Sequence, residues 1–341
     1  MSNQVHNVTR ASQAARIAAI VGLVLLVALV AAPYWAGRAD MRLMSELFLY
    51  LALASLWNLM AGYAGLVSVG QHAYVGLGGY VLFGLTIFGN QHPLIAVAAA
   101  GLLAALISIP VAILIFRLRG AYFAIGTWVI AEVFRLSFSQ VSALGGGSGT
   151  SLPIGVIKSL AEGRDTREAV SYWLALGVAL LVVTAVYLFL RSRKGLALTA
   201  IRDNELAAGS LGIDIWRTKF LVYVVTAALT AVTGAVIFLQ KLRISPDAAF
   251  SVNDWTAFAI FIVVIGGIGT VEGPIIGTLI FFLLRETLAD LGTIYLTILG
   301  LVAIVIMLKA PKGIWGLIRT RFDLQLFPLG YRVHKSDKKE N

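Results

Sequence analysis

The residues that could carry chemistry in this sequence are the few polar ones inside long apolar runs. Glu132 and Arg135 are three positions apart in one such run, where ionisable side chains are costly and often functional. A structural ion pair and a role in a solute path both remain open for them. Four other polar residues lie in or beside similar runs: Gln71, His72, Tyr122 and Thr127. With Glu132 they form a candidate polar path for a small zwitterion, and the alternative for each is a hydrogen bond between helices.

Several kinds of reactive site are excluded by residue type. The chain has no cysteine, which excludes disulfides, thiol nucleophiles, iron–sulfur clusters and cysteine-ligated zinc. Its four histidines are scattered, so no metal site is expected. A phosphate-binding loop needs a Gly-Lys pair after a glycine-rich turn, and the chain has no Gly-Lys pair. The GGGSGTS stretch at 145–151 is expected to be a flexible turn. The sequence predicts neither an enzyme nor a cofactor.

The composition indicates which solvent surrounds the chain. Of its 341 residues, 59% are hydrophobic and 13% are charged, whereas soluble proteins carry about 25% charged residues. A spanning helix needs roughly 20 apolar residues, and the chain has many such runs. Strands of a membrane barrel alternate in polarity instead. The sequence therefore predicts an all-α polytopic membrane protein.

We expect about ten transmembrane helices, within a range of eight to eleven. Spans three, eight and nine are rich in glycine and could be broken or re-entrant. Small residues also allow helices to pack closely in lipid, and close packing is the favoured role of these glycines. The ten predicted spans are 17–36, 43–61, 66–88, 93–116, 121–138, 172–190, 219–240, 254–270, 274–289 and 293–309.

The distribution of basic residues predicts the orientation, because Lys and Arg concentrate in cytoplasmic segments. If both termini are cytoplasmic, 18 of the 27 Lys and Arg residues lie inside and seven lie outside. The net charge of +10 is then explained by topology and by contact with anionic lipids, and no nucleic acid is needed. The predicted parts are an inner N-terminal segment (1–16), a transmembrane domain (17–309) with an outer loop (139–171) and an inner loop (191–219), and an inner tail (310–341).

The inner loop contains a short polar stretch, RDNELAAGSLGI, at 202–213. Asp203 or Asn204 can cap a helix N-terminus, and Gly212 suits its C-terminal end. A helix here places four residues on one narrow face: Asn204, Ala207, Ala208 and Leu211. That face suits docking into a groove of another protein. The alternative is a helix lying on the inner membrane surface, although its acidic residues would then face acidic lipids.

The stretch AIRDNELAAGSLGIDIWRTKFLVYVVTA resembles the cytoplasmic coupling loop of ATP-binding-cassette importer permeases of the branched-chain amino acid type. Ala207, Ala208 and Gly212 match the permease pattern, while Glu205 is displaced by one position, as in this subfamily. A downstream Leu-Pro of other permeases is absent. His72 stands where the family more often has a small residue. Further blocks that resemble the family are GLVSVGQHAYVGLGGY (65–80), LRGAYFAIGT (118–127), GGGSGT (145–150), GGIGTVEGPIIGT (266–278) and PKG (311–313).

The resemblance implies a transport machine in a bacterial inner membrane. This chain would pair with a second, similar permease, two cytoplasmic ATP-binding subunits and a periplasmic solute-binding protein. The ATPases would dock on the 202–213 helix, and the import of branched-chain or related amino acids would follow. Residues implied in coupling are Asn204, Glu205, Ala207, Ala208, Leu211 and Gly212.

Other functions remain as alternatives. Related permeases carry urea, short amides or other small polar solutes. An ion-driven secondary transporter would be expected to show inverted repeats and charges at mid-membrane, and neither is clear in this sequence. A membrane-embedded enzyme needs His, Asp or Glu residues that converge at one membrane face, and four scattered histidines do not supply them.

Overall fold

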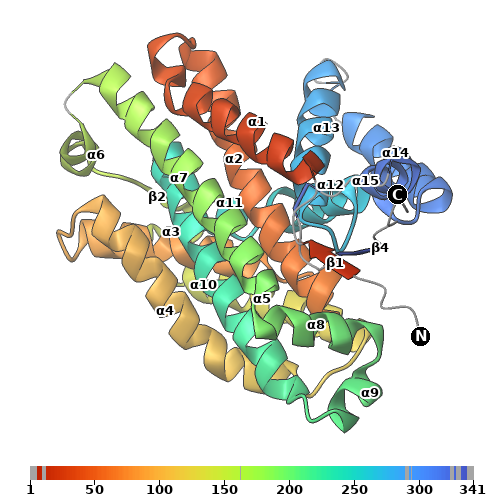
Figure 1. Ribbon diagram of the computed structural model, residues 1–341. Helices are drawn as coiled ribbons and strands as arrows, with labels where there is room; N and C mark the ends of the chain where they lie inside the picture. The colour runs from red at the N-terminus through yellow and green to blue at the C-terminus, as the bar shows by residue number, and fades with distance from the viewer. Residues whose placement is uncertain are drawn as a thin grey trace, which may run out of the picture.

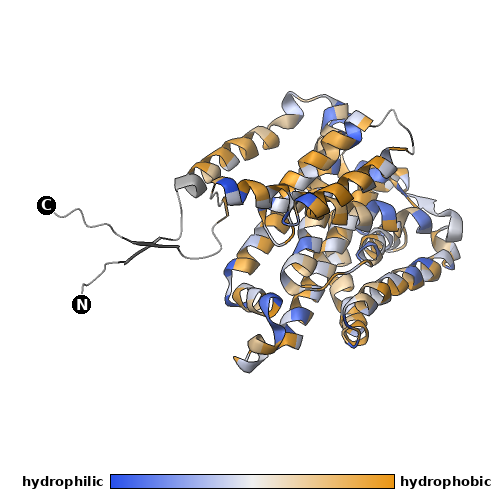
Figure 2. Cartoon of the chain, turned by 90° about the vertical axis from the view of Figure 1, so that its right-hand side faces the viewer, coloured by the Kyte–Doolittle hydropathy of each residue, from blue (hydrophilic) through white to orange (hydrophobic). Residues whose placement is uncertain are grey.

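The structure, a computed structural model, describes residues 6–9, 13–161, 163–288, 292, 294–322, 326–327 and 332–335. It is a bundle of long helices (Figure 1). Within the described residues, seven helices are long and apolar enough to cross a membrane, and two shorter helices are also apolar. Apolar residues dominate the helices in Figure 2, where polar residues gather at helix ends and connections. The predicted all-α polytopic class is therefore confirmed.

Each predicted span falls on a helix of the structure. The number of membrane crossings and the orientation of the termini stay predictions, as do the proposed segment boundaries. The helices that coincide with the predicted spans are α1 (Gln13–Val30), α2 (Arg38–Asn58) with the π-helical η2 (Leu59–Tyr63), α3 (His72–Ile87), α4 (Pro93–Ile115), α5 (Ala121–Ser139), α7 (Arg164–Arg191), α10 (Ile215–Lys241), the π-helical η5 (Asn253–Ala257) with α12 (Phe258–Gly266), α13 (Glu272–Leu288) and α14 (Ile294–Lys309).

Short elements connect these helices or follow them. They are β1 (His6–Thr9), η1 (Ala32–Tyr34), η3 (Ser142–Leu144), η4 (Gly146–Ser148), β2 (Thr150–Ser151), α6 (Ile154–Leu160), α8 (Arg193–Asp203), α9 (Glu205–Ser210), β3 (Arg243–Ile244), α11 (Pro246–Ala249), α15 (Gly313–Phe322) and β4 (Arg332–Lys335). The antiparallel pairing of β1 with β4 brings the two ends of the chain together.

Two helices are longer than their apolar runs. α7 begins at Arg164, eight residues before the predicted span, because the polar stretch after Gly163 continues the same helix. Arg164 Nε lies 3.5 Å from Glu168 Oε1, one turn further on, a spacing that supports a helix. The outer loop predicted at 139–171 is shortened accordingly. At the inner side, α10 begins at Ile215, where the Asp214 carboxylate accepts a hydrogen bond from the Arg217 backbone N–H at 2.9 Å.

The glycine-rich stretch at 145–151 contains the turn η4, and its last residues pack against β3. Its strand β2 pairs antiparallel with β3, with Thr150 opposite Ile244. Gly149 has φ +76°, and a Cβ there would collide with the Ile244 carbonyl. Only glycine combines this backbone conformation with so close an approach. The stretch is a tight corner that ties the outer end of α5 to the outer end of α10.

Close helix packing through glycine is confirmed in the middle of the bundle. α10 packs along α3 and α4, α2 packs along α7, and α12 packs along α13. A Cβ at Gly78 of α3 would collide with the Ala231 backbone of α10, and one at Gly234 would collide with the Val75 backbone. Missing side chains let the two helices approach closely, which is how helices associate in lipid.

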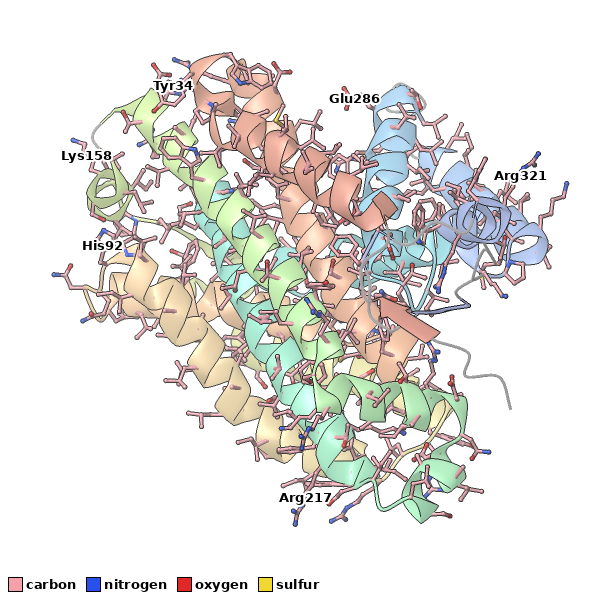
Figure 3. All side chains as sticks on the ribbon, in the orientation of Figure 1. Tyr34, His92, Lys158, Arg217, Glu286 and Arg321 are labelled. Carbon is pink, nitrogen blue, oxygen red and sulfur yellow. The ribbon has the colours of Figure 1, made fainter. Side chains whose placement is uncertain are left out.

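The helix ends divide into two groups. In Figure 3, Tyr34, Lys158 and Glu286 lie at the upper end of the bundle, and Arg217 lies at the lower end. The predicted topology places the first three positions near the outer side and Arg217 inside. Below, the two ends are called outer and inner on this basis.

Candidate functional site

The inner loop between α7 and α10 forms two short helices instead of one. The Ser192 hydroxyl accepts a hydrogen bond from the Gly195 backbone N–H at 3.3 Å and so caps α8. A Cβ at Gly195 would collide with the Leu190 backbone, so glycine permits the sharp turn out of α7. Leu198 and Ile201 are buried and anchor α8 to the bundle.

Asn204 separates α8 from α9. Its backbone is extended, and its side-chain Oδ1 accepts a hydrogen bond from the Ala207 backbone N–H at 3.0 Å. This is the N-cap arrangement, and of the two predicted caps Asn204 is the one that forms. Gly212 has φ +83° and follows the helix end as predicted. The helix Glu205–Ser210 is shorter than the predicted stretch 202–213. It begins only at Glu205, because the capping residue Asn204 lies outside the helix that it caps.

One residue of the predicted docking face is wrong. Ala208 is only 1% exposed and faces the rest of the chain. Asn204, Ala207 and Leu211 are exposed. The most exposed apolar side chains of the 202–213 stretch are Leu206 at 86% and Leu211 at 81%, so the free surface of α9 and the residue after it is more apolar than the sequence suggested.

An ion pair and a cleft set the position of α9. Glu205 Oε2 lies 2.9 Å from Lys219 Nζ in the first turns of α10, which ties the two helices together. Beside this ion pair, α9 borders a cleft of about 1000 Å³ that reaches the α4–α5 turn and the segment before α3. Side chains lining the cleft include Leu66, Phe116, Arg119, Leu206, Trp216 and Lys219.

The residues of the predicted polar path divide into two groups. Gln71, His72 and Thr127 lie together at the start of α3 and are buried. They support an irregular segment at 65–71, where the predicted span 66–88 is interrupted before His72. Irregular backbone is tolerated at membrane depth only where its polar groups find partners or line a cavity.

Hydrogen bonds account for these buried side chains. Gln71 Nε2 donates to the Leu53 carbonyl at 3.1 Å, and His72 Nδ1 is 2.9 Å from the Thr256 hydroxyl. The Thr127 hydroxyl accepts from the Val69 backbone N–H at 3.1 Å. Each of the three side chains thus makes a hydrogen bond to another segment, but Gln71 Oε1 is buried without a partner among the described residues. We call Asn58, Ser68, Gln71, His72, Thr127 and Thr256 the inner polar cluster.

Tyr122 and Glu132 lie apart from this cluster. The Tyr122 side chain, in the first turn of α5, is 74% exposed. Glu132 forms an ion pair with Arg135 at 2.6 Å, and Arg135 also binds Asp247 of α11 at 2.7 Å. The pair is therefore structural in this arrangement, although the Glu132 side chain is still about half exposed.

Asn58 is the member of the cluster whose importance the sequence analysis missed. Its Nδ2 donates to the Thr270 carbonyl at 2.7 Å, and its Oδ1 accepts from the Gly269 backbone N–H at 2.8 Å. One side chain thereby holds the loop between α12 and α13. Arg202 of α8 lies against the same loop, beside Gly269. An asparagine inside the predicted apolar span 43–61 was the available signal, since polar residues there need partners.

Metal binding has no candidate in the part of the chain that the structure describes. No group of three or more His, Asp or Glu side chains there is close enough to hold an ion.

Comparison with known proteins identifies the family. Residues 41–310 match the family described as the permease component of the branched-chain amino acid transport system. The chain is 27% identical, over 86% of its length and 74% of the relative's, to the high-affinity branched-chain amino acid transport system permease protein LivM of Salmonella typhimurium. It is 25% identical to the probable LivM of Methanocaldococcus jannaschii, over 70% of this chain and 78% of that one.

A second group of relatives carries a different name. The permease protein LivH of Escherichia coli is 31% identical over 48% of this chain and 52% of its own. No solved structure matches the chain significantly. The family match covers most of the chain and agrees with the resemblance of the coupling-loop sequence. This multi-pass membrane protein therefore belongs to the family of branched-chain amino acid transport system permease components.

Proposed function

We propose that this chain is the membrane subunit of an ATP-binding-cassette importer that moves branched-chain or related amino acids into the cytoplasm. ATP hydrolysis takes place on two separate subunits, which dock on α9 and the residues around it. The observation that carries this proposal is the geometry of α9. It is a capped helix with exposed apolar side chains, and it joins the inner ends of two long spans.

The connections of α9 suit the transmission of force. α8 links it to α7 through a tight turn, and the Glu205–Lys219 ion pair links it to α10. Arg202, at the end of α8, contacts the loop that Asn58 holds. A displacement of α9 would therefore be transmitted to α7, to α10 and to the loop that Asn58 holds. The cleft beside α9 leaves room for it to move, and rigid-body tilting of the attached helices would produce alternating access.

A second permease subunit is part of the proposal. The relatives include two differently named permeases, LivM and LivH. The surface of α5 supports a partner. Among the seven candidate spans α5 is the least apolar, yet only the Ile294–Phe322 segment is less buried. Charged side chains such as Glu132 do not face lipid cheaply, so we place a solute path or the second permease at this face, with Tyr122 and Glu132 beside it.

The proposed solute is supported by the names of the relatives, which are branched-chain amino acid permeases. A periplasmic solute-binding protein would supply the solute at the outer end, and the bilayer would be a bacterial inner membrane. Urea, short amides and other small polar solutes are the alternatives. Binding measurements on the cognate solute-binding protein would decide between them.

The coupling role is tested by placing charge on α9. Leu206→Asp and Leu211→Asp each put a carboxylate on an exposed apolar position, so they leave the fold intact and oppose docking in an apolar groove. We expect at least a tenfold loss of ATP-dependent leucine uptake and loss of co-purification with the ATPase subunits, because an unpaired buried charge costs several kcal/mol at an interface.

The matched control is Ile154→Asp in α6. Ile154 is also exposed, at 72%. Its replacement by Asp makes the same chemical change at the outer end. It should leave ATPase co-purification unchanged. Normal uptake by the Leu206 and Leu211 variants at normal abundance would overturn the docking role of α9.

A further inference from the structure

A cavity at the outer end of the bundle has the chemistry of an amino acid site. It has a volume of about 480 Å³ and lies between α2, the end of α10 and the π-helical turn η5. Ligand pockets of this size combine an apolar lining with a few convergent polar groups. The residues that define this outer cavity include Arg42, Glu46, Tyr50, Ile237, Lys241 and Trp255.

Charges of both signs stand at the cavity. Arg42 and Lys241 supply two cations, and Glu46 supplies a carboxylate one helical turn from Arg42. Glu46 is held in place by Arg285 of α13, whose Nη1 lies 2.7 Å from Glu46 Oε1. Arg42 has no ion-pair partner among the described residues. Lys241 Nζ lies 4.6 Å from the centre of the Trp255 ring, so its charge is kept beside the cavity.

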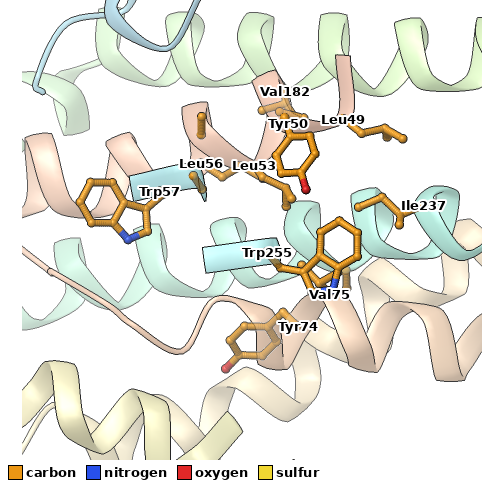
Figure 4. Close-up of a cluster of buried hydrophobic side chains, with 14 of the residues drawn as sticks. Leu49, Tyr50, Leu53, Leu56, Trp57, Tyr74, Val75, Val182, Ile237 and Trp255 are labelled. Carbon is orange, nitrogen blue, oxygen red and sulfur yellow. The ribbon is translucent and has the colours of Figure 1, made fainter. Parts of the chain in front are cut away.

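The remaining wall is apolar and deeply buried. Leu49 and Leu53 follow Arg42 and Glu46 along one face of α2, and Ile237 faces them from α10. Figure 4 shows the Tyr50 hydroxyl pointing between Leu53, Ile237 and Trp255. That hydroxyl has no hydrogen-bond partner among the residues that the structure describes.

We propose that the outer cavity binds an aliphatic α-amino acid as its zwitterion. The solute carboxylate meets Arg42 and Lys241, its ammonium group meets Glu46, and its branched side chain lies against Leu49 and Ile237. This assignment rests on the proposed function for the choice of solute class. It gives the permease its own solute site, separate from that of an external binding protein.

A neighbouring cavity supports the assignment. It measures about 390 Å³ and shares Arg42, Gln240 and Leu242 with the first. Its lining holds four arginines, Arg38, Arg42, Arg164 and Arg167, and one carboxylate, Glu168. Arg38 and Arg164 pair with Glu168, which leaves Arg42 and Arg167 as the arginines without an ion pair among the described residues. Basic residues are scarce on the outer side, so their clustering at one opening concentrates positive potential where a carboxylate would enter.

The test uses the full-length chain, purified with its partner permease in lipid nanodiscs and without the solute-binding protein. L-leucine is titrated by calorimetry, beside leucinamide, which lacks the carboxylate, and 4-methylpentanoate, which lacks the ammonium group. We expect saturable leucine binding and at least tenfold weaker binding of both analogues, because each leaves a charged group of the site without its partner. Equal binding of all three compounds would overturn the zwitterion site.

Variants separate this site from the proposed function. Arg42→Gln should weaken leucine binding about tenfold or more and leave leucinamide binding unchanged, whereas Leu49→Phe should weaken both by filling the cavity. Lys158→Gln is the matched control, since it removes one exposed positive charge from the same end of the molecule outside both cavities. Unchanged leucine binding by Arg42→Gln and Leu49→Phe overturns the site even if the assembled transporter still imports leucine. If the parent transporter with its binding protein and ATP imports no leucine, the proposed function itself fails.

Discussion

The inner polar cluster and the outer cavity use the same kinds of residue in opposite ways. In the inner cluster, Gln71, His72 and Thr127 donate to or accept from neighbouring helices and backbone. In the outer cavity, Arg42 and the Tyr50 hydroxyl have no partner among the described residues. Most polar groups of the inner cluster are paired within the protein, although Gln71 Oε1 is buried without a partner among the described residues, whereas Arg42 at the outer cavity is exposed and unpaired there.

The difference shows that a polar residue in an apolar span is not by itself a solute contact. Buried polar groups need hydrogen bonds wherever they lie. The irregular backbone at 65–71 needs hydrogen-bond partners for the same reason, and polar side chains can provide them. A binding site is indicated instead by polar groups that remain unpaired around an empty volume. This contrast predicts that substitutions in the inner cluster reduce stability, whereas substitutions at the outer cavity change ligand binding.

The largest effect on stability is expected at Asn58. Asn58→Leu keeps the approximate size of the side chain but leaves the Gly269 N–H and the Thr270 carbonyl unpaired. We expect a loss of about 2–3 kcal/mol in the free energy of unfolding, since each buried unpaired group costs about 1–3 kcal/mol and hydrogen bonds within membranes fall at the lower end of such values. Thermal unfolding of the purified protein measures it.

The control for Asn58 is Asn253, which is exposed. Asn253→Leu should leave the unfolding temperature unchanged. If Asn58→Leu is equally harmless, the inner polar cluster is not closed in the way the hydrogen bonds indicate, and the contrast with the outer cavity breaks down.

Sequence analysis predicted the helices far better than these connections. Runs of apolar residues locate spans because each run has only one way to hide its backbone in a bilayer. The partner of Asn58 is more than 200 residues away, so no local pattern could reveal it. The same holds for the outer cavity, where Arg42, Glu46 and Lys241 meet only after α2 and α10 pack together.

The coupling loop shows where local reasoning succeeds and where it stops. Capping chemistry is local, so the Asn204 cap and the left-handed Gly212 were predictable. Which face of a six-residue helix turns inward depends on the helices beside it. The sequence therefore placed Ala208 on the free surface, and the structure buries it.

An intermediate effect is expected at Thr127. Thr127→Val removes the hydroxyl that accepts from the Val69 N–H and keeps the shape of the side chain. The free energy of unfolding should fall by about 1 kcal/mol. Thr127→Ser retains the hydroxyl and should recover most of that loss. If Thr127→Val is as stable as the parent, the hydrogen bond to the Val69 N–H contributes nothing to stability; if Thr127→Ser is destabilising, the methyl group contributes by packing.

The smallest effect on stability is expected at the outer cavity. It is the most direct test of the difference between the inner polar cluster and the outer cavity. Arg42 is exposed and forms no ion pair among the described residues, so Arg42→Gln should change the free energy of unfolding by less than about 0.5 kcal/mol. The same variant is expected to weaken leucine binding, so stability and binding separate at this residue. Thermal unfolding with and without leucine measures both quantities in one experiment. A large loss of stability without leucine would show that Arg42 is structural, and the open cavity would then belong to the same class as the inner polar cluster.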